Sequence, residues 1–446
     1  MKESKIAVFA YLDDWVPAGV LKLSEDKDQV LASAFSYGTK YLDRRNAVEV
    51  DPVSLGFSEK ADLKYKEIFP TEPLTYFGGI RDASPDAWGR LVIENKLKVK
   101  SSDLLESDYL LHAGSDRVGA LDIRKKIDDT PTSSLTDWGN LQYLMEAADR
   151  IDQGLPIPAS LEIIYKNGSA LGGARPKATI RDENNILHLA KFSTSKDQYS
   201  VPEIEMATLK LASECGLTVP EVKVVQLGAK KVMLIRRFDR YFSGPDNTPL
   251  SMNDGLISLP IDGGSEKRYA FISGLTLLNC HETESRSKSY IDLAVAIGKY
   301  CHESVIQENR EQLFSRMIYN ILVSNDDDHL RNHGFIFDPK LGGWRLSPLY
   351  DVTPRPGISQ EKYLHLGVGD HGRAATINNA LSRHQIFGLS LKSAEEKVEK
   401  IYGKVREWKV YFEEYGVSGK DIDAVATAFR RMDDIRENPE SVVVEI

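Results

Sequence analysis

The order in which periodic patterns occur along the chain constrains its fold more than any other sequence feature. Alternating apolar residues typical of strands recur early in the chain, as at 6–12, 19–23 and 34–37. Beyond about residue 265 strand patterns become rare and helical spacing replaces them, as at 291–300 and 311–323. Strands first and helices later argue against a repeating strand–helix–strand enzyme, and they predict a two-lobed α+β protein.

The middle of the chain adds further expected elements. A helix is predicted after Ser84 or Asp86, either of which can cap its first turn. Residues 161–165, 177–180 and 186–192 have strand patterns. The remaining predicted elements are helices at 141–151, 202–215 and 394–415, strands at 222–225 and 232–235, and a polar loop at 125–136.

Composition excludes several classes of protein. With 446 residues, of which 41% are hydrophobic and 28% charged, the chain can bury a large core and is not largely disordered. No apolar run approaches the ~18 residues that a membrane span needs. Three scattered cysteines form neither a disulfide framework nor a metal-binding pair, which favours a reducing cytoplasm. The net charge of −9 argues against extensive direct binding of nucleic acid.

A glycine-rich segment at 168–177 is the first place where the sequence indicates chemistry. Its glycines allow close approach of the backbone to a ligand, and successive N–H groups can bind phosphate oxygens. Arg175 and Lys177 add positive charge. The segment matches neither common nucleotide-binding glycine motif, and taken alone it is interpreted as a hairpin turn between two strands. Lys191 follows in an apolar strand, where burial requires a partner such as Glu203 or Glu205, unless the strand lies at an edge and Lys191 reaches water.

A dense polar stretch at 324–333 is the second such place. It follows an apolar helix and precedes a short expected strand at 334–337. Three adjacent acids, at 326–328, repel one another unless a cation or a proton intervenes. Asp327 and Asn332 are five residues apart, which is the separation of the base and a Mg²⁺ ligand in the protein-kinase catalytic loop. A solvated acidic helix end is the alternative interpretation, but acids there oppose the helix dipole.

Asp351 marks the third place, about twenty residues further on. The pattern at 344–354 predicts a strand that ends at this residue. A carboxylate at a strand end, this far beyond a catalytic loop, is where protein kinases have their second Mg²⁺ ligand. The order of the three places therefore predicts more than any one of them alone.

Taken together, these motifs closely resemble those of the HipA-like kinases, the toxin subunits of bacterial type II toxin–antitoxin modules. The resemblance rests on the loop Asn325-Asp-Asp-Asp-His-Leu-Arg-Asn332 and on Pro348-Leu-Tyr-Asp-Val352. It extends to the glycine loop, to Lys191-Phe192, to Arg237-Phe-Asp-Arg240 and to the segment from Phe77 to Arg90, and so spans most of the chain.

The resemblance implies a protein-kinase-like fold of the HipA type. Its β-rich N-terminal lobe would carry an extra N-terminal subdomain, and its C-terminal lobe would be mainly helical. Residues 1–125 would form the extra subdomain, and residues 126–250 the lobe with the phosphate loop, the ATP lysine and the hinge. Residues 251–446 would form the helical lobe with the catalytic and metal-binding loops.

The resemblance also implies roles for single residues. Asp327 would be the general base, and Asn332 and Asp351 would hold Mg²⁺. Lys191 would contact the α- and β-phosphates of ATP, and His329 would order the catalytic loop. The loop that would cover the triphosphate consists of Ser169, Ala170, Leu171, Gly172, Gly173, Ala174, Arg175 and Lys177, and the backbone of Arg236, Arg237 and Phe238 would face adenine. Ser169 is the hydroxyl residue of this loop and would be the site of autophosphorylation, which ejects the loop in the family.

The activity so implied is transfer of the ATP γ-phosphoryl group to a Ser or Thr hydroxyl of a protein, as by a growth-inhibiting toxin. The family's best-known target is an aminoacyl-tRNA synthetase, which makes a translation-related substrate the expectation. Its partner is a small helix-turn-helix antitoxin of the HipB type, so DNA contact would be mainly indirect, and no membrane partner is expected.

Three alternatives remain open. A metallohydrolase could use the acids at 326–328 with His329 and His333, but it leaves the glycine loop and Lys191 unexplained. A non-catalytic nucleotide-binding regulator would bind ATP without transfer. A small-molecule kinase of related fold would differ only in its acceptor.

Overall fold

The computed structural model groups the chain into two compact units. It describes residues 1–27, 29–132, 136–170, 172–244, 264–359 and 361–436. The first unit comprises Met1–Lys196, Lys223–Cys280 and Gly334–Trp344, and the second comprises Asp197–Val222, His281–His333 and Arg345–Ile446. The two boundaries between the three predicted domains, at 125/126 and 250/251, stay predictions, and the second of them lies outside the described residues.

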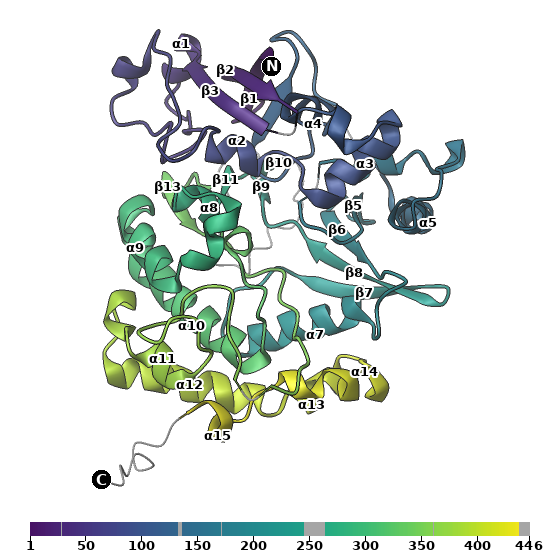
Figure 1. The fold of residues 1–446 in the computed structure, drawn as a ribbon, viewed down its shortest axis with the longest axis vertical. Coiled ribbons are helices and arrows are strands. Elements are labelled where there is room, and N and C mark those ends of the chain that lie inside the picture. The colour runs from purple at the N-terminus through teal and green to yellow at the C-terminus, as the bar shows by residue number, and fades with distance from the viewer. Residues whose placement is uncertain (28, 133–135, 171, 245–263, 360, 437–446) are drawn as a thin grey trace. The chain divides into compact units, whose positions relative to one another are not determined.

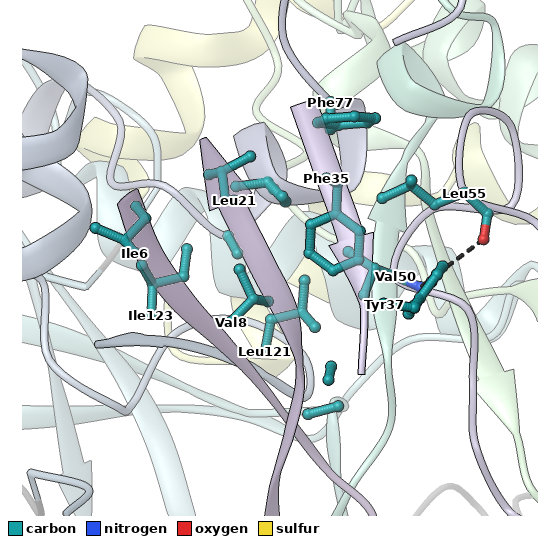
Figure 2. Packing of buried hydrophobic residues seen from close by; sticks show 14 of the residues in the cluster. Ile6, Val8, Leu21, Phe35, Tyr37, Val50, Leu55, Phe77, Leu121 and Ile123 are labelled. Atoms are coloured by element: carbon teal, nitrogen blue, oxygen red, sulfur yellow. Dashed lines mark hydrogen bonds between the residues drawn. The ribbon is translucent and has the colours of Figure 1, made fainter. Parts of the chain in front are cut away.

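An antiparallel sheet at the N-terminus confirms the first predicted strands. Its order is β3-β2-β1-β4, with bounds Gln29–Tyr37, Trp15–Asp26, Lys2–Tyr11 and Leu121–Arg124. Alternate residues such as Ile6 and Val8 point to one face, because side chains of a strand alternate between faces. Figure 2 shows them packed with Leu21, Phe35 and Phe77 in one apolar core. The short helices beside this sheet are α1 (Thr39–Leu42), α2 (Gly78–Asp82) and α4 (Glu106–His112).

A second antiparallel sheet of the first unit carries the glycine loop and Lys191. Its order is β5-β6-β8-β7, with bounds Lys177–Arg181, Leu187–Phe192, Lys230–Arg236 and Val222–Leu227. Its apolar residues share a core with helices α3 (Ala87–Leu97), α5 (Leu141–Asp152) and α6 (Ile164–Asn167). Figure 1 shows α3 and α5 beside this sheet. Asp86 caps α3 by accepting a hydrogen bond from Ala87 N, as one of the two predicted caps.

The strand predicted at 161–165 is wrong. This segment is a 3₁₀ turn, Ala159–Leu161, followed by α6. Leu161 and Ile164 are buried while Glu162 is exposed, a spacing of three that suits a helix lying on the sheet. The short apolar run did not distinguish a strand from a buried helical turn.

Two smaller sheets complete the described strands. One pairs β10 (Ser265–Arg268) with β9 (Arg240–Ser243), and the other has the order β11-β12-β13, with bounds Phe271–Ser273, Gly334–Asp338 and Gly343–Leu346. The strand expected at 334–337 is thus confirmed as β12. Helix α8 (Gly274–Leu277) follows β11 directly.

The second unit is mainly helical. Its long element is α10 (Ile306–Val323), whose residues from Leu313 to Val323 are all buried. The other helices are α7 (Val201–Glu214), α9 (Tyr290–Tyr300), α11 (Ile377–Leu381), α12 (Leu391–Val405), α13 (Trp408–Glu414), α14 (Gly419–Val425) and α15 (Met432–Ile435). The single helix predicted at 394–415 is two, because α12 ends at Val405 and α13 begins at Trp408.

These two units have the predicted α+β architecture, β-rich first and mainly helical afterwards. Among the described residues, no helix is both long and apolar enough to cross a membrane.

Candidate active site

The glycine loop is not a hairpin turn. It begins directly after α6, where Gly168 is the C-cap, and it ends where β5 begins at Lys177. Gly173 has φ +77°, a left-handed conformation that favours glycine. Its N–H donates to Asp86 Oδ2 (3.1 Å), and its carbonyl accepts from Trp88 N (3.0 Å). The start of α3 therefore fixes the loop, of which Leu171 lies outside the described residues.

The side chains of this loop have distinct environments. Gly172 and Ala174 are exposed, Arg175 is half-buried and Ala170 is buried. Lys177 Nζ donates to Gly172 O (2.7 Å), and a Cβ on Gly173 would lie 2.5 Å from this nitrogen. The backbone and the ammonium group thus lie close together, and the left-handed φ of Gly173 favours glycine at this position.

Ser169 is buried in this conformation. Its Oγ donates to Ala113 O (3.0 Å), so the hydroxyl faces the interior of the first unit. Phosphorylation of Ser169 would require the start of the loop to leave this position. Its predicted modification stays a prediction.

Lys191 lies directly opposite Lys177 in the β5–β6 register. Directly opposed residues of an antiparallel pair project to the same face, so both ammonium groups leave the sheet on one side. Both lysines are buried. Like charges directly opposite one another in a sheet repel, so anionic or polar groups near these two lysines would stabilise their side chains.

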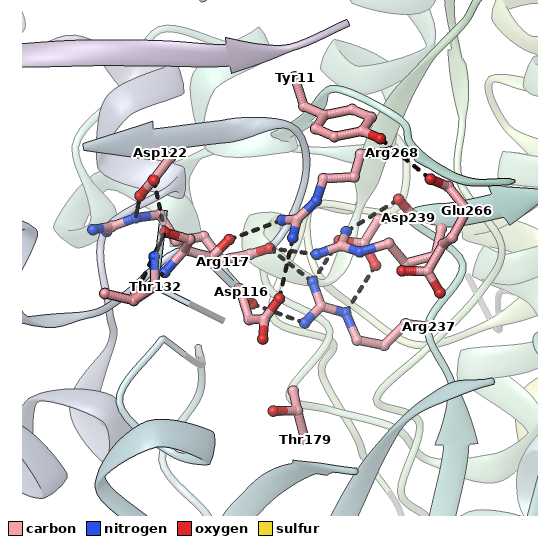
Figure 3. Close-up of polar contacts among 12 residues, drawn as sticks. Tyr11, Asp116, Arg117, Asp122, Thr132, Thr179, Arg237, Asp239, Glu266 and Arg268 are labelled. Atoms are coloured by element: carbon pink, nitrogen blue, oxygen red, sulfur yellow. Dashed lines mark hydrogen bonds and ion pairs between the residues drawn. The ribbon is translucent and has the colours of Figure 1, made fainter. Parts of the chain in front are cut away.

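The predicted hinge segment is held by a buried ionic cluster (Figure 3). Arg237 donates to Asp239 through Nε (2.9 Å) and Nη2 (2.6 Å), and its Nη2 also donates to Arg117 O (2.8 Å). Burial raises the pKa of Asp239, but Arg237 and Arg240 outweigh it and hold that pKa below its usual range. The Arg237 side chain is therefore engaged in the protein interior, and its backbone N–H donates to Leu187 O (3.0 Å). The adenine contact of this segment stays a prediction.

The two residues on either side of Arg237 in the chain, Arg236 and Phe238, have different contacts. Arg236 is buried at the end of β8, opposite His188 of β6. The Phe238 ring lies beside the Phe271 ring, with centroids 6.3 Å apart. Sequence reasoning missed Asp239, although an acid flanked by charges beside two strands was a signal for a buried ionic cluster.

The acidic loop of the second unit begins where α10 ends. Ser324 has φ +51° and stops the helix. Asp326 and Asp327 are exposed, and both pair with Arg355: Nε lies 3.1 Å from Asp326 Oδ1, and Nη2 lies 2.6 Å from Asp327 Oδ2. Asp328 is buried. The expected repulsion among the three acids is thus relieved by one shared guanidinium and by turning the third acid inward.

Asp328 is the centre of a buried hydrogen-bond network. Its Oδ2 accepts from the Tyr290 hydroxyl, from Asn320 Nδ2 (2.8 Å) and from His333 Nε2 (2.9 Å). Burial raises the pKa of Asp328, but His333 and the hydrogen bonds that it receives lower it overall. This network fixes the loop that carries Asp327 to helices α9 and α10. Sequence reasoning missed this role, since three consecutive acids look alike in the sequence.

Asn332 is buried at the end of the same loop. Its Nδ2 donates to Asp327 O (3.2 Å), so its amide oxygen points away from that carbonyl and suits a cation. The backbone of the loop closes through His329 N to Asp327 O (2.8 Å) and Asn332 N to His329 O (2.8 Å). The half-buried His329 ring stands edge-on to His365, with centroids 5.8 Å apart.

Asp351 does not end a strand, contrary to prediction. Strand β13 ends at Leu346, because the following Ser347-Pro348 cannot continue a hydrogen-bonded ladder. Asp351 is exposed with φ +59°, a conformation that Asp tolerates better than most residues. The adjacent Tyr350 hydroxyl donates to Arg331 O (2.7 Å), next to Asn332 in the chain. This bond links the residue before Asp351 to the residue before Asn332.

The donor chemistry of these residues fits Mg²⁺. An amide oxygen and a carboxylate are hard oxygen ligands, and Mg²⁺ commonly takes one or two protein ligands beside phosphates and waters. No group of three or more His, Cys, Asp or Glu side chains placed to hold a metal occurs in the part of the chain that the structure describes. The role of Asn332 and Asp351 as Mg²⁺ ligands stays a prediction.

Comparisons with known proteins agree with this class of protein, a two-lobed kinase-like fold. Residues 169–409, more than half of the chain, match the model of the HipA-like C-terminal domain. The chain therefore belongs to the HipA-like family.

Individual relatives of this chain have low sequence identity to it. A putative kinase of Haemophilus influenzae is 27% identical over 218 residues, which cover 45% of this chain and 58% of the relative. A putative kinase of Sinorhizobium fredii is 24% identical over 349 residues, 75% of each chain. Among solved structures, a chain of the Shewanella oneidensis complex of HipA, HipB and operator DNA has a TM-score of 0.64. It is 16% identical and covers 95% of this chain and 94% of its own, which establishes the fold.

Proposed function

We propose that this chain is an ATP-dependent Ser/Thr protein kinase of the HipA type. The observation that carries the proposal is the catalytic loop itself. Asp327 is exposed at the loop surface, and Asn332 Nδ2 donates to its carbonyl oxygen. The hydroxyl of Tyr350, which precedes Asp351, donates to the carbonyl of Arg331, which precedes Asn332. These two bonds join Asn332 to Asp327 and join the residues that precede Asn332 and Asp351 in the chain.

The proposed roles follow from this arrangement. Asp327 orients the acceptor hydroxyl and takes its proton, as a positioned base typically contributes ~10²–10⁴-fold. Mg²⁺ held by Asn332 and Asp351 would neutralise charge on the transferring phosphoryl group. Lys177 and Lys191, opposed on β5 and β6, would bind phosphate oxygens of ATP.

The proposed partners follow from the family. A small antitoxin of the HipB type would bind this chain, and DNA contact would be mainly indirect. The acceptor would be a Ser or Thr of a protein, an aminoacyl-tRNA synthetase being the expected class, and growth inhibition would be the consequence. Autophosphorylation at Ser169 is part of the proposal.

Intact-mass spectrometry before and after ATP and Mg²⁺ tests this function. The expected result is a phosphate-sized gain in the wild type, a much slower gain in Asp327→Asn, and a still slower gain or none in Asp351→Ala. Peptide mapping then shows whether Ser169 carries the phosphate. If the wild type gains nothing, phosphoproteomics of expressing cells is the second arm, and unchanged phosphorylation there contradicts a kinase. Normal transfer by Asp351→Ala contradicts the assigned role of this residue.

A further inference from the structure

Arg355 contacts the proposed base directly. Its Nη2 is 2.6 Å from Asp327 Oδ2, the carboxylate that would accept the proton of the substrate hydroxyl. Its Nε is 3.1 Å from Asp326 Oδ1. Two nitrogens of the Arg355 guanidinium thus contact the two exposed carboxylates, and a guanidinium carries five N–H donors. Donors therefore remain for a further anion.

The backbone of Arg355 is fixed more firmly than that of an ordinary surface arginine. Pro354 and Pro356 flank it, so the preceding φ is locked and Arg355 itself is confined to extended conformations. Its N–H donates to Ser324 O (3.2 Å), at the residue that ends α10. This anchoring lowers the entropy lost when the guanidinium binds a ligand.

Lys362, a neighbouring cation, is engaged elsewhere. Its Nζ donates to Ser324 Oγ (2.9 Å) and to Thr427 O (3.1 Å). Burial is the main cause that lowers the pKa of Lys362. Lys362 therefore makes its hydrogen bonds elsewhere, whereas Arg355 contacts the carboxylate of Asp327.

We infer that Arg355 is a further catalytic residue, which binds a γ-phosphoryl oxygen during transfer. The inference rests on the proposed kinase function. In the step, the hydroxyl oxygen of the acceptor forms a bond to the γ-phosphorus and its proton passes to Asp327. The bond from phosphorus to the bridging oxygen breaks, and its electron pair leaves with ADP. Arg355 neutralises negative charge on the oxygens of the phosphoryl group while it is being transferred.

The distances allow this contact. A base accepts from the hydroxyl at about 2.6–3.2 Å, and the attacking oxygen approaches phosphorus to about 3–3.5 Å. The phosphorus therefore comes within about 6–7 Å of Asp327 Oδ2, the atom on which Arg355 Nη2 already lies. Rotation of the long Arg355 side chain spans the remaining distance without movement of its anchored backbone.

The alternative is an ordinary surface ion pair without a role in transfer. The side chains of Arg355 and Asp327 are 53% and 54% exposed, and such pairs contribute little to stability. This exposure is an advantage for the test, because loss of Arg355 should not unfold the protein. Arg383 and Asp370 of the same unit form a matched pair, 2.6 Å apart and 53% and 45% exposed.

The experiment compares Arg355→Ala and Arg355→Lys with Arg383→Ala in the full chain. Three quantities are measured: the rate of phosphate transfer, the melting temperature, and the affinity for ADP with Mg²⁺, with and without aluminium fluoride. Aluminium fluoride mimics the phosphoryl group in the transition state, and transition-state analogues bind more tightly than substrates do.

Arg355→Ala should slow transfer about 10²-fold, as loss of one preorganised donor does elsewhere. It should also lose the gain in ADP affinity that aluminium fluoride gives the wild type, while ADP alone binds as before. Added guanidinium should restore part of the rate to Arg355→Ala. Arg383→Ala should match the wild type throughout.

Two results overturn the inference while the kinase function stands: transfer by Arg355→Ala at or above the wild-type rate, or an unchanged gain from aluminium fluoride. A wild type that neither binds ADP nor transfers phosphate contradicts the proposed function instead.

Discussion

Replacing Asp328 with Ala should strongly destabilise the second unit. Three buried donors, from Tyr290, Asn320 and His333, would lose their common acceptor. Each buried donor left unsatisfied costs about 1–3 kcal/mol, and removing one partner of a buried ion pair costs about 3–5 kcal/mol. Because a cavity of one carboxylate lets neighbours relax, we expect the free energy of unfolding to fall by about 3–5 kcal/mol rather than by the full sum.

Asp326→Ala is the matched control, because it changes the same residue type two positions away on the surface. The Asp326 side chain is 48% exposed, and its removal should change the free energy of unfolding by no more than about 0.5 kcal/mol. Urea unfolding followed by circular dichroism gives the overall difference. Hydrogen exchange in peptides from α9 and α10 assigns the difference to the network.

The pH dependence of this deficit has a definite sign. The folded-state pKa of Asp328 is lowered, so its contribution is present above its unfolded pKa, ~3.9, and is lost as the pH falls through the folded value. The difference between wild type and Asp328→Ala should be steady near pH 6 and narrow below about pH 4. Equal stability of the Asp328 and Asp326 variants at pH 6 would refute the assignment of Asp328 as the structural acid.

Three further predictions concern other parts of the molecule. Gly173→Ala should weaken binding of an ATP analogue in calorimetry at least tenfold, because of its positive φ and the contact of a new Cβ with Lys177; wild-type affinity would contradict the proposed role of this loop in binding ATP. Asp239→Ala should lower the free energy of unfolding of the first unit by about 3–5 kcal/mol, measured in urea at pH 7. The difference from the wild type should shrink in strong acid, because the pKa of Asp239 is lowered in the folded protein; an unchanged urea midpoint at pH 7 would contradict the stabilising role of Asp239. Burial raises the pKa of both the Cys215 and Cys301 thiols to about 12, so a thiol reagent at pH 8 should label them slowly in the native protein and rapidly in urea; fast native labelling would contradict their burial.

The sequence indicated the architecture because its signals there are local. Strand β2 alternates, with Leu21 and Leu23 buried and Lys22 exposed, whereas α10 carries a longer helical run that is buried throughout from Leu313 to Val323. The short run at 161–165 was the exception, since its few apolar residues satisfy either period. The strand predicted to reach Asp351 failed for a local reason as well, because Pro348 interrupts the ladder.

For the candidate site, the motif spacing determined which residues to consider, and this selection is independent of tertiary structure. Only the tertiary structure distinguished the three adjacent acids. Asp328 is buried because Tyr290, Asn320 and His333 converge on it from two helices and the end of the loop, whereas Asp327 is exposed and pairs with Arg355. Burial and pairing depend on residues up to about forty positions away in the chain, and consecutive identical residues carry no information about such contacts.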